Sequence, residues 1–160
     1  MKAHMMTANL RDQLIGGWEL VSYMEEPLIE SPRNYPMGER PMGTIMYTPD
    51  GYMSAQLMRP NPSHFVSDDW FKATPEEYGR AASTYFAYAG AFRVDEEKSI
   101  VTHIVLVSLF PNWIGQKQRR AARIEGDKLH LSTVTPIQAG GQSVNAYLQW
   151  RRLGSCGATA

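Results

Sequence analysis

Eight short segments of this 160-residue chain alternate between apolar and polar residues, and turn signals separate them. Alternation with a period of two is typical of strands that bury one face, because successive side chains point to opposite sides of a sheet. The clearest turn is Thr-Pro-Asp-Gly at residues 48–51, since Asp-Gly between two alternating segments is a strong hairpin signal. The segments cover residues 18–24, 43–48, 52–58, 91–95, 100–110, 116–124, 128–134 and 143–152. Eight strands joined mostly by hairpins predict a mainly β fold, an up-and-down antiparallel barrel.

Two helical segments accompany these strands. Residues 10–15 have the pattern of one or two helical turns just before the first strand. A second helix starts at Thr74, a suitable N-cap, with Pro75 at the first helical position and two acids in the first turn. We expect this helix to run to about Tyr88, to end near Gly90, and to lie between the third and fourth strands over the barrel mouth or side.

Composition narrows the class of protein. With 16 basic and 16 acidic residues the chain has no net charge, which argues against a nucleic-acid partner held by bulk electrostatics. No apolar run approaches the ~20 residues that cross a bilayer, and residues 1–7 lack the apolar core of a secretory signal. The single cysteine, Cys156, excludes a disulfide within the chain. We therefore expect one cytoplasmic domain over residues 8–153, with flexible termini at 1–7 and 154–160 and no membrane partner.

The first predicted strand opens with Gly16-Gly17-Trp18. Glycine allows the backbone to turn tightly into the strand, and an indole at this place can plug one end of a closed barrel. A plugged barrel has one open mouth, and an interior that its own side chains do not fill tends to hold a small molecule. The sequence therefore predicts a ligand cavity, and a barrel filled by its own side chains is the alternative.

Several short motifs add to this beginning. They lie at residues 47–59, 74–78, 88–90, 101–103, 108–113, 126–129 and 150–152. Together with the helical turn and Gly-x-Trp, they resemble the lipocalin-like domain family of small intracellular barrels. The resemblance covers residues 14–152 and implies a calycin-type barrel. It implies no single activity, because relatives of this barrel type include binders and cofactor-free cyclases of natural products.

Two departures from the family's pattern concern the barrel interior. Related sequences often carry Arg-Arg-aromatic where this chain has Arg120-Ala121-Ala122. An inward Ala122 would enlarge the cavity, unless a neighbouring strand supplies the missing ring. Where a second histidine is expected after His103, this chain has Ile104, which argues against paired-histidine chemistry.

Strand alternation predicts which side chains face the interior. Taking Trp18 as inward places Ser22 and Met24 on the same side. The segment 100–110 is apolar on both faces, so alternation leaves open whether His103 points inward or outward. A strand that is apolar on both sides is covered on both, outside by the helix or by a second subunit, which makes a homodimer plausible.

Arg120 gives the sharpest chemical signal. If Val107 lies opposite Arg120 on the neighbouring strand, His103 shares a face with Arg120 and Ala122. An inward guanidinium among apolar walls needs a carboxylate, phenolate or enolate oxygen as its partner, and a place on the outer rim with the charge in water is the alternative. His103 acts either as an acid or base near neutral pH or as a hydrogen-bonded core residue.

The candidate site residues combine these inferences. Tyrosines offer hydroxyl donors at the mouth, methionines adapt to an irregular ligand, and a tryptophan after the long strand stacks on it. The candidate catalytic residues are Arg120, His103 and Tyr88. The candidate ligand-binding residues are Trp18, Ser22, Tyr47, Met53, Gln56, Tyr85, Val105, Trp113, Ala122 and Trp150. If the facing is inverted, the interior is lined by Tyr52, Gln56, Asn145, Tyr147 and Gln149.

Two functions fit these features. One is a cofactor-independent isomerase or cyclase of an apolar, oxygenated natural product of polyketide or terpenoid type, with Arg120, His103 or a tyrosine stabilising negative charge on a carbonyl. The other is a carrier of a hydrophobic small molecule without turnover. The expected cytoplasmic location favours the enzyme, and a filled barrel that only dimerises is a third possibility. The four histidines show no metal-ligand spacing and the chain has no nucleotide-binding motif, so we expect no metal and no cofactor.

Overall fold

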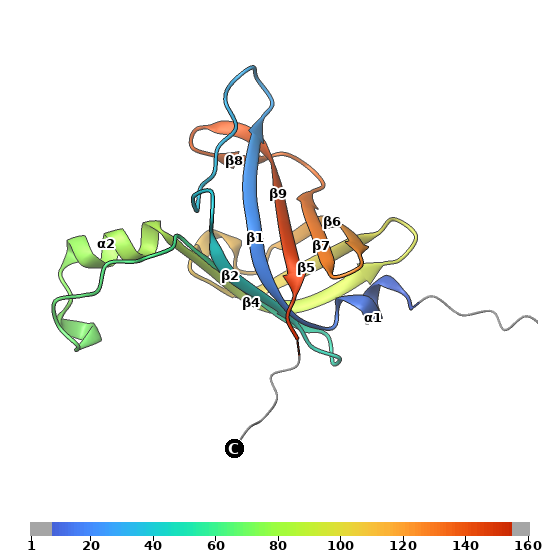
Figure 1. The fold of residues 1–160 in the computed structure, drawn as a ribbon, viewed down its shortest axis with the longest axis horizontal. Helices are drawn as coiled ribbons and strands as arrows, with labels where there is room; N and C mark the ends of the chain where they lie inside the picture. The colour runs from blue at the N-terminus through green and yellow to red at the C-terminus, as the bar shows by residue number, and fades with distance from the viewer. Residues whose placement is uncertain (1–7, 155–160) are drawn as a thin grey trace, which may run out of the picture.

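The alternating segments form the strands of a closed barrel in the computed structural model, which describes residues 8–154 (Figure 1). The termini predicted to be flexible, residues 1–7 and 155–160, lie outside the described residues. In chain order the elements are α1 (Leu10–Leu14), β1 (Gly16–Pro27), β2 (Met42–Tyr47), β3 (Tyr52–Met58), η1 (Trp70–Lys72), α2 (Pro75–Ser83), β4 (Tyr85–Asp95), β5 (Ile100–Ser108), η2 (Pro111–Trp113), β6 (Lys117–Glu125), β7 (Lys128–Thr133), β8 (Ile137–Ala139) and β9 (Gln142–Arg152).

Hydrogen bonding between the first and last strands closes the barrel. Neighbouring strands pair in the order β1-β2-β3-β4-β5-β6-β7-β9, and β1 pairs antiparallel with β9 from Trp18 opposite Arg152 to Pro27 opposite Val144. The short β8 adds to β9 at the other side of its hairpin. The predicted up-and-down barrel is therefore confirmed. The sequence does not predict β8, because three residues are too few to show an alternation.

A β-bulge in β1 changes which residues of this strand face inward. The register between β1 and β9 shifts between Leu20 and Ser22, so β1 carries an extra residue there. Beyond the bulge, Tyr23 and Glu25 line the barrel interior. The prediction that Ser22 and Met24 face inward is wrong, because one additional residue inverts the alternation along the rest of the strand.

The helix α2 is shorter than predicted. Its start is the predicted one, since Thr74 and Glu77 form a capping box in which each side chain accepts from the other's backbone N–H. The helix ends at Ser83, however, and Tyr85 and Tyr88 belong to β4. Alternating aromatic and small residues suit a strand that pairs on both sides, and this pairing overrides their helical spacing.

Gly90 lies at a close contact between the backbones of β4 and β5, not at a helix end as predicted. The register of the two strands shifts between Ala89 and Gly90. A Cβ atom on Gly90 would lie 1.9 Å from the carbonyl oxygen of Ile104, so only glycine fits this position.

The strands β5 and β6 pair in a different register from the predicted one. Arg120 lies opposite Val101 instead of Val107, because η2 takes up part of a longer connection between the strands. The two registers differ by an even number of residues, so each side chain keeps its predicted face. His103 and Arg120 are both buried and line the interior, which resolves the facing of β5.

One end of the barrel is closed by α1 and the first tryptophan. Leu14 and Trp18 are fully buried, and the indole N–H of Trp18 donates to the carbonyl oxygen of Leu14 at 2.9 Å. The Arg152 guanidinium lies over the Trp18 ring, 4.0 Å from its centroid. The interior therefore opens toward the opposite end, where the chain forms η2, β8 and the start of β4.

The segment that contains η1 and α2 projects from the barrel as the green arm at the left of Figure 1. Within residues 8–154, no helix combines the length and the apolar character needed to cross a membrane. The outer face of β5 exposes Leu106 and Val107, 57% and 62% accessible, and is where the predicted homodimer would form. The homodimer stays a prediction, which sedimentation equilibrium would test.

Candidate functional site

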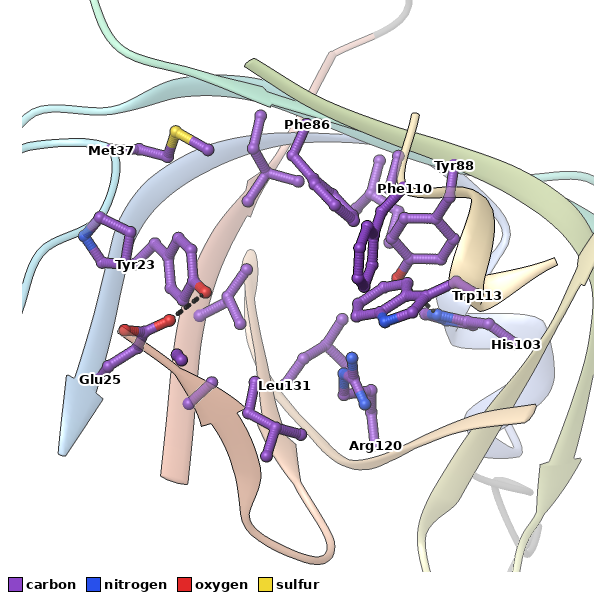
Figure 2. Close-up of a pocket in the computed structure, with 18 of the residues that line it drawn as sticks. Tyr23, Glu25, Met37, Phe86, Tyr88, His103, Phe110, Trp113, Arg120 and Leu131 are labelled. Carbon is purple, nitrogen blue, oxygen red and sulfur yellow. Dashed lines mark hydrogen bonds between the residues drawn. The ribbon is translucent and has the colours of Figure 1, made fainter. Parts of the chain in front are cut away.

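A cavity of about 260 Å³ lies inside the barrel. Most of its wall is apolar, and the inner faces of β2, β3, β7 and β9 contribute only apolar residues to it. Phe86, Phe110 and Trp113 stand together on one side (Figure 2). Residues 137–139 of β8 also line the cavity. The volume exceeds the roughly 150 Å³ that holds a benzene molecule in an engineered protein cavity. The barrel therefore has room for a small substituted aromatic molecule.

A buried histidine lies between two tyrosines at this cavity. The hydroxyl of Tyr47 is 2.9 Å from Nε2 of His103, and the hydroxyl of Tyr88 is 2.9 Å from Nδ1. Removal from water lowers the pKa of His103 to about 3, and the positive charge of Arg120 acts in the same direction. His103 is therefore neutral at pH 7, with a hydroxyl on each ring nitrogen.

Arg120 brings a positive charge to the same cavity. The residue is only 9% exposed; its Nη1 donates to the carbonyl oxygen of Arg119 at 3.0 Å, and its Nη2 lies 3.5 Å from the side-chain oxygen of Gln118. Its guanidinium is 6.0 Å from the ring centroid of Trp113. Among residues 8–154, no carboxylate lies within ion-pair distance of Arg120. A guanidinium has five N–H donors, so most of its capacity is left for a molecule in the cavity.

A buried carboxylate faces the cavity from β1. Glu25 is 4% exposed, and its two oxygens accept from the Tyr23 hydroxyl at 2.6 Å and from the side-chain amide of Asn34 at 3.0 Å. Burial and the neighbouring carboxylate raise the pKa of Tyr23, which keeps its hydroxyl protonated and donating. Figure 2 shows Tyr23 and Glu25 at one side of the cavity, with Arg120 and His103 toward the other.

Sequence reasoning missed Tyr23 and Glu25, because it placed the opposite face of β1 inside the barrel. Their spacing is the signal that was available. Residues two apart on a strand share a face, so a tyrosine and an acid at this spacing stay together whichever way the strand is turned.

The three candidate catalytic residues all line the cavity. Arg120 comes from β6, His103 from β5 and Tyr88 from β4. Two of the candidate ligand-binding residues, Trp113 in η2 and Trp150 on β9, also line it.

The other eight candidates do not line the cavity. Those packed in the surrounding core are Trp18, Tyr47, Met53, Val105 and Ala122. Those at outward-facing positions of their strands are Ser22, Gln56 and Tyr85. Their placement corrects the sequence-based assignment, since the first five pack among other core side chains and the bulge in β1 turns Ser22 outward.

Ala122 is the clearest of these corrections. It is 5% exposed and lies opposite Leu131 of β7, which lines the cavity where Ala122 does not. The prediction that Ala122 lines the cavity is therefore wrong. The inverted facing is also wrong, because Tyr52 and Tyr147 are exposed on the outside of the barrel.

Two comparisons relate this chain to known proteins. The chain matches the model of a family described as a lipocalin-like domain over residues 15–153, which span every strand of the barrel. It is also similar to the 4'-hydroxy-3'-methoxypropiophenone carrier protein ppsC of Aspergillus oryzae. The two sequences are 40% identical over 107 residues, which make up 63% of this chain and 96% of the relative.

Proposed function

Because this chain belongs to the lipocalin-like domain family, we propose that its barrel binds an apolar, oxygenated aromatic molecule and acts as its carrier. The observation that carries the proposal is the buried guanidinium of Arg120 in an otherwise largely apolar cavity. A charge in such surroundings is costly unless hydrogen-bond partners satisfy it, and an oxygen atom of a bound molecule supplies such a partner. Phe86 and Trp113 offer face and edge contacts to a planar ring.

Three features favour carriage over catalysis. His103 is neutral and hydrogen-bonded at both ring nitrogens, so it is poorly placed to move a proton. The described residues that line the cavity include no serine, cysteine or lysine that could act as a nucleophile. The relative from Aspergillus oryzae is named as a carrier of a phenolic aryl ketone.

A binding titration tests the proposal. Trp113 and Trp150 line the cavity, so we expect 4'-hydroxy-3'-methoxypropiophenone to change the intrinsic tryptophan fluorescence, saturably and with one molecule bound per chain. Replacing Arg120→Met removes the charge and most of the hydrogen bonding, and should weaken binding about tenfold or more. Arg119→Met is the matched control, because Arg119 is exposed on the neighbouring outward position. Absence of binding, or equal affinity of the two variants, would refute the proposal.

A second candidate is a cofactor-independent isomerase or cyclase of a natural-product intermediate. The convergence of Arg120 and Tyr88 on one cavity supports it, since both can stabilise negative charge that develops on a carbonyl oxygen. Incubation with aryl ketone and polyketide-type probes, followed by mass spectrometry and chiral chromatography, distinguishes the two functions. A carrier returns every probe unchanged, whereas an enzyme forms product and loses turnover, but not all affinity, in Arg120→Ala.

A further inference from the structure

Two opposite charges are buried at the same cavity without forming an ion pair. Glu25 on β1 is held by neutral donors, and Arg120 on β6 by neutral acceptors; no salt bridge joins them among the described residues. Buried charges are usually paired with each other, because pairing offsets the loss of hydration. Here they remain apart and face one apolar volume, with an acidic pole at Glu25 and a basic pole at Arg120 (Figure 2).

The hydrogen bonds of His103 decide what Tyr88 offers to a ligand. Tyr47 is 2% exposed, and its hydroxyl has one partner in the described part of the chain, Nε2 of His103. The hydroxyl hydrogen of Tyr47 is satisfied when it donates to Nε2, and this places the ring hydrogen of His103 on Nδ1. Nδ1–H then donates to the Tyr88 oxygen, which leaves the hydroxyl hydrogen of Tyr88 for the cavity. Tyr88 is thus a second donor at the basic pole.

The two poles define the chemistry of the occupant. The carboxylate at the acidic pole accepts a hydrogen bond, so it matches a donor on the ligand. The N–H and O–H groups at the basic pole donate, so they match an acceptor. A hydrocarbon matches neither pole, and a simple aryl carboxylic acid matches the basic pole alone. A flat molecule with a hydroxyl at one end and a carbonyl at the other matches both.

We infer that the cavity holds a hydroxyaryl ketone in one orientation, with the phenol hydroxyl donating to Glu25 and the carbonyl oxygen accepting from Arg120 and Tyr88. This inference rests on the proposed function and adds the orientation and the two specificity-determining poles. The aromatic ring then lies between the poles, where Phe86 and Trp113 line the wall.

Affinities of three probes for three proteins test the orientation. The probes are 4'-hydroxy-3'-methoxypropiophenone, 3',4'-dimethoxypropiophenone, whose hydroxyl is capped, and 2-methoxy-4-propylphenol, which lacks the carbonyl. The proteins are the unaltered chain, Glu25→Gln and Arg120→Met. In the unaltered chain, capping the hydroxyl and removing the carbonyl should each weaken binding about tenfold.

Each variant should reduce one of these two losses of affinity and leave the other unchanged. In Glu25→Gln the penalty for capping the hydroxyl should fall to about threefold, while the penalty for removing the carbonyl persists. In Arg120→Met the penalty for removing the carbonyl should fall, while the penalty for capping the hydroxyl persists. Glu26→Gln is the control for charge, because Glu26 is a neighbouring acid that pairs with Arg33 at the surface, and it should behave like the unaltered chain.

Each other pattern has a distinct meaning. If the hydroxyl penalty depends on Arg120 and the carbonyl penalty on Glu25, the ligand is bound the other way round and the inference is wrong. If the probes bind but neither variant alters either penalty, Glu25 and Arg120 do not recognise the hydroxyl and the carbonyl, and the inference is wrong. The proposed function is then decided by whether Arg120→Met binds the ketone more weakly than Arg119→Met. If no probe binds the unaltered chain, the proposed function fails and the inference fails with it.

Absorption spectra give a readout that needs no variant. The phenolate of a hydroxyaryl ketone absorbs at longer wavelength than the phenol, because its charge spreads onto the carbonyl. A carboxylate beside the phenol disfavours the phenolate, whereas a guanidinium favours it. During a pH titration the bound ketone should therefore become phenolate at higher pH than the free ketone. A shift to lower pH would show that the phenol does not donate to the carboxylate of Glu25 and would overturn the orientation.

Discussion

Burial makes His103 an orienting group for Tyr88. Its imidazole lies in the barrel interior with a tyrosine hydroxyl on each ring nitrogen. Protonation of the ring would cost it hydration, and Arg120 would repel the charge. Among residues 8–154 no carboxylate forms an ion pair with this ring. A histidine on an apolar strand suggests acid–base chemistry. The ring of His103, however, is fully buried and hydrogen-bonded at both nitrogens, and we infer that it orients the hydroxyl of Tyr88 instead.

The pH dependence of stability should report this histidine. In the folded chain the pKa of His103 is about 3, against 6.5 for an unperturbed histidine, so between these values the unfolded state binds a proton that the folded state does not. The free energy of unfolding should therefore fall as the pH drops below about 6.5, by up to about 1.4 kcal/mol per pH unit from this residue.

Urea unfolding of the unaltered chain and of His103→Gln, between about pH 7 and about pH 4.5, measures the effect. Glutamine keeps a donor and an acceptor but does not titrate. We expect the variant to be the less sensitive to acid, and parallel curves for the two proteins would contradict the assignment.

At the scale of elements, two irregularities in strand pairing determine which side chains reach the cavity. The bulge in β1 turns Glu25 inward, and the shift at Gly90 brings β4 close to β5. Both depend on how one strand pairs with another: β1 with β9 from the other end of the chain, and β4 with β5 across a hairpin. They are therefore part of the sheet and cannot be seen in the alternation of one segment.

The glycine at the second irregularity should be indispensable. In Gly90→Ala the added methyl group would meet the backbone of Ile104, which cannot move aside as a side chain can. We expect a loss of about 3 kcal/mol or more in the free energy of unfolding, or failure to fold.

Gly79→Ala provides the comparison. Gly79 lies within α2 with nothing within 4 Å of an added Cβ, so alanine should raise stability by roughly 0.5–1 kcal/mol. Chemical denaturation of both variants measures the difference, and a Gly90→Ala protein of unaltered stability would show that the strands can separate there.

The barrel could be predicted because its signals are local. Each hairpin has its own turn residues and each strand its own alternation, and the shared face of His103 and Arg120 survives an even error in register. The acid at residue 25 could not be predicted, because one bulge inverts the face of the strand. Tyr85 and Tyr88 fit a helix and a strand equally well by spacing, and only pairing with β3 and β5 decides between them.

At the scale of the whole molecule, closure determines how the barrel is used. The β1–β9 pairing seals the wall, and Leu14, Trp18 and Arg152 close one end. The backbone amides of Leu10 and Arg11 donate to the carboxylate of Glu96, which fastens α1 at that end of the sheet. The remaining opening is the end where η2 and β8 line the cavity.

A barrel that is closed at one end constrains how a bound ligand exchanges for another. A ligand enters and leaves through the same opening. A competitor therefore cannot displace the bound molecule from the closed end and binds only after it has dissociated. In a stopped-flow chase followed by tryptophan fluorescence, the dissociation rate of bound 4'-hydroxy-3'-methoxypropiophenone should not change with competitor concentration. A dissociation rate that rises with competitor concentration would show a second opening at the closed end.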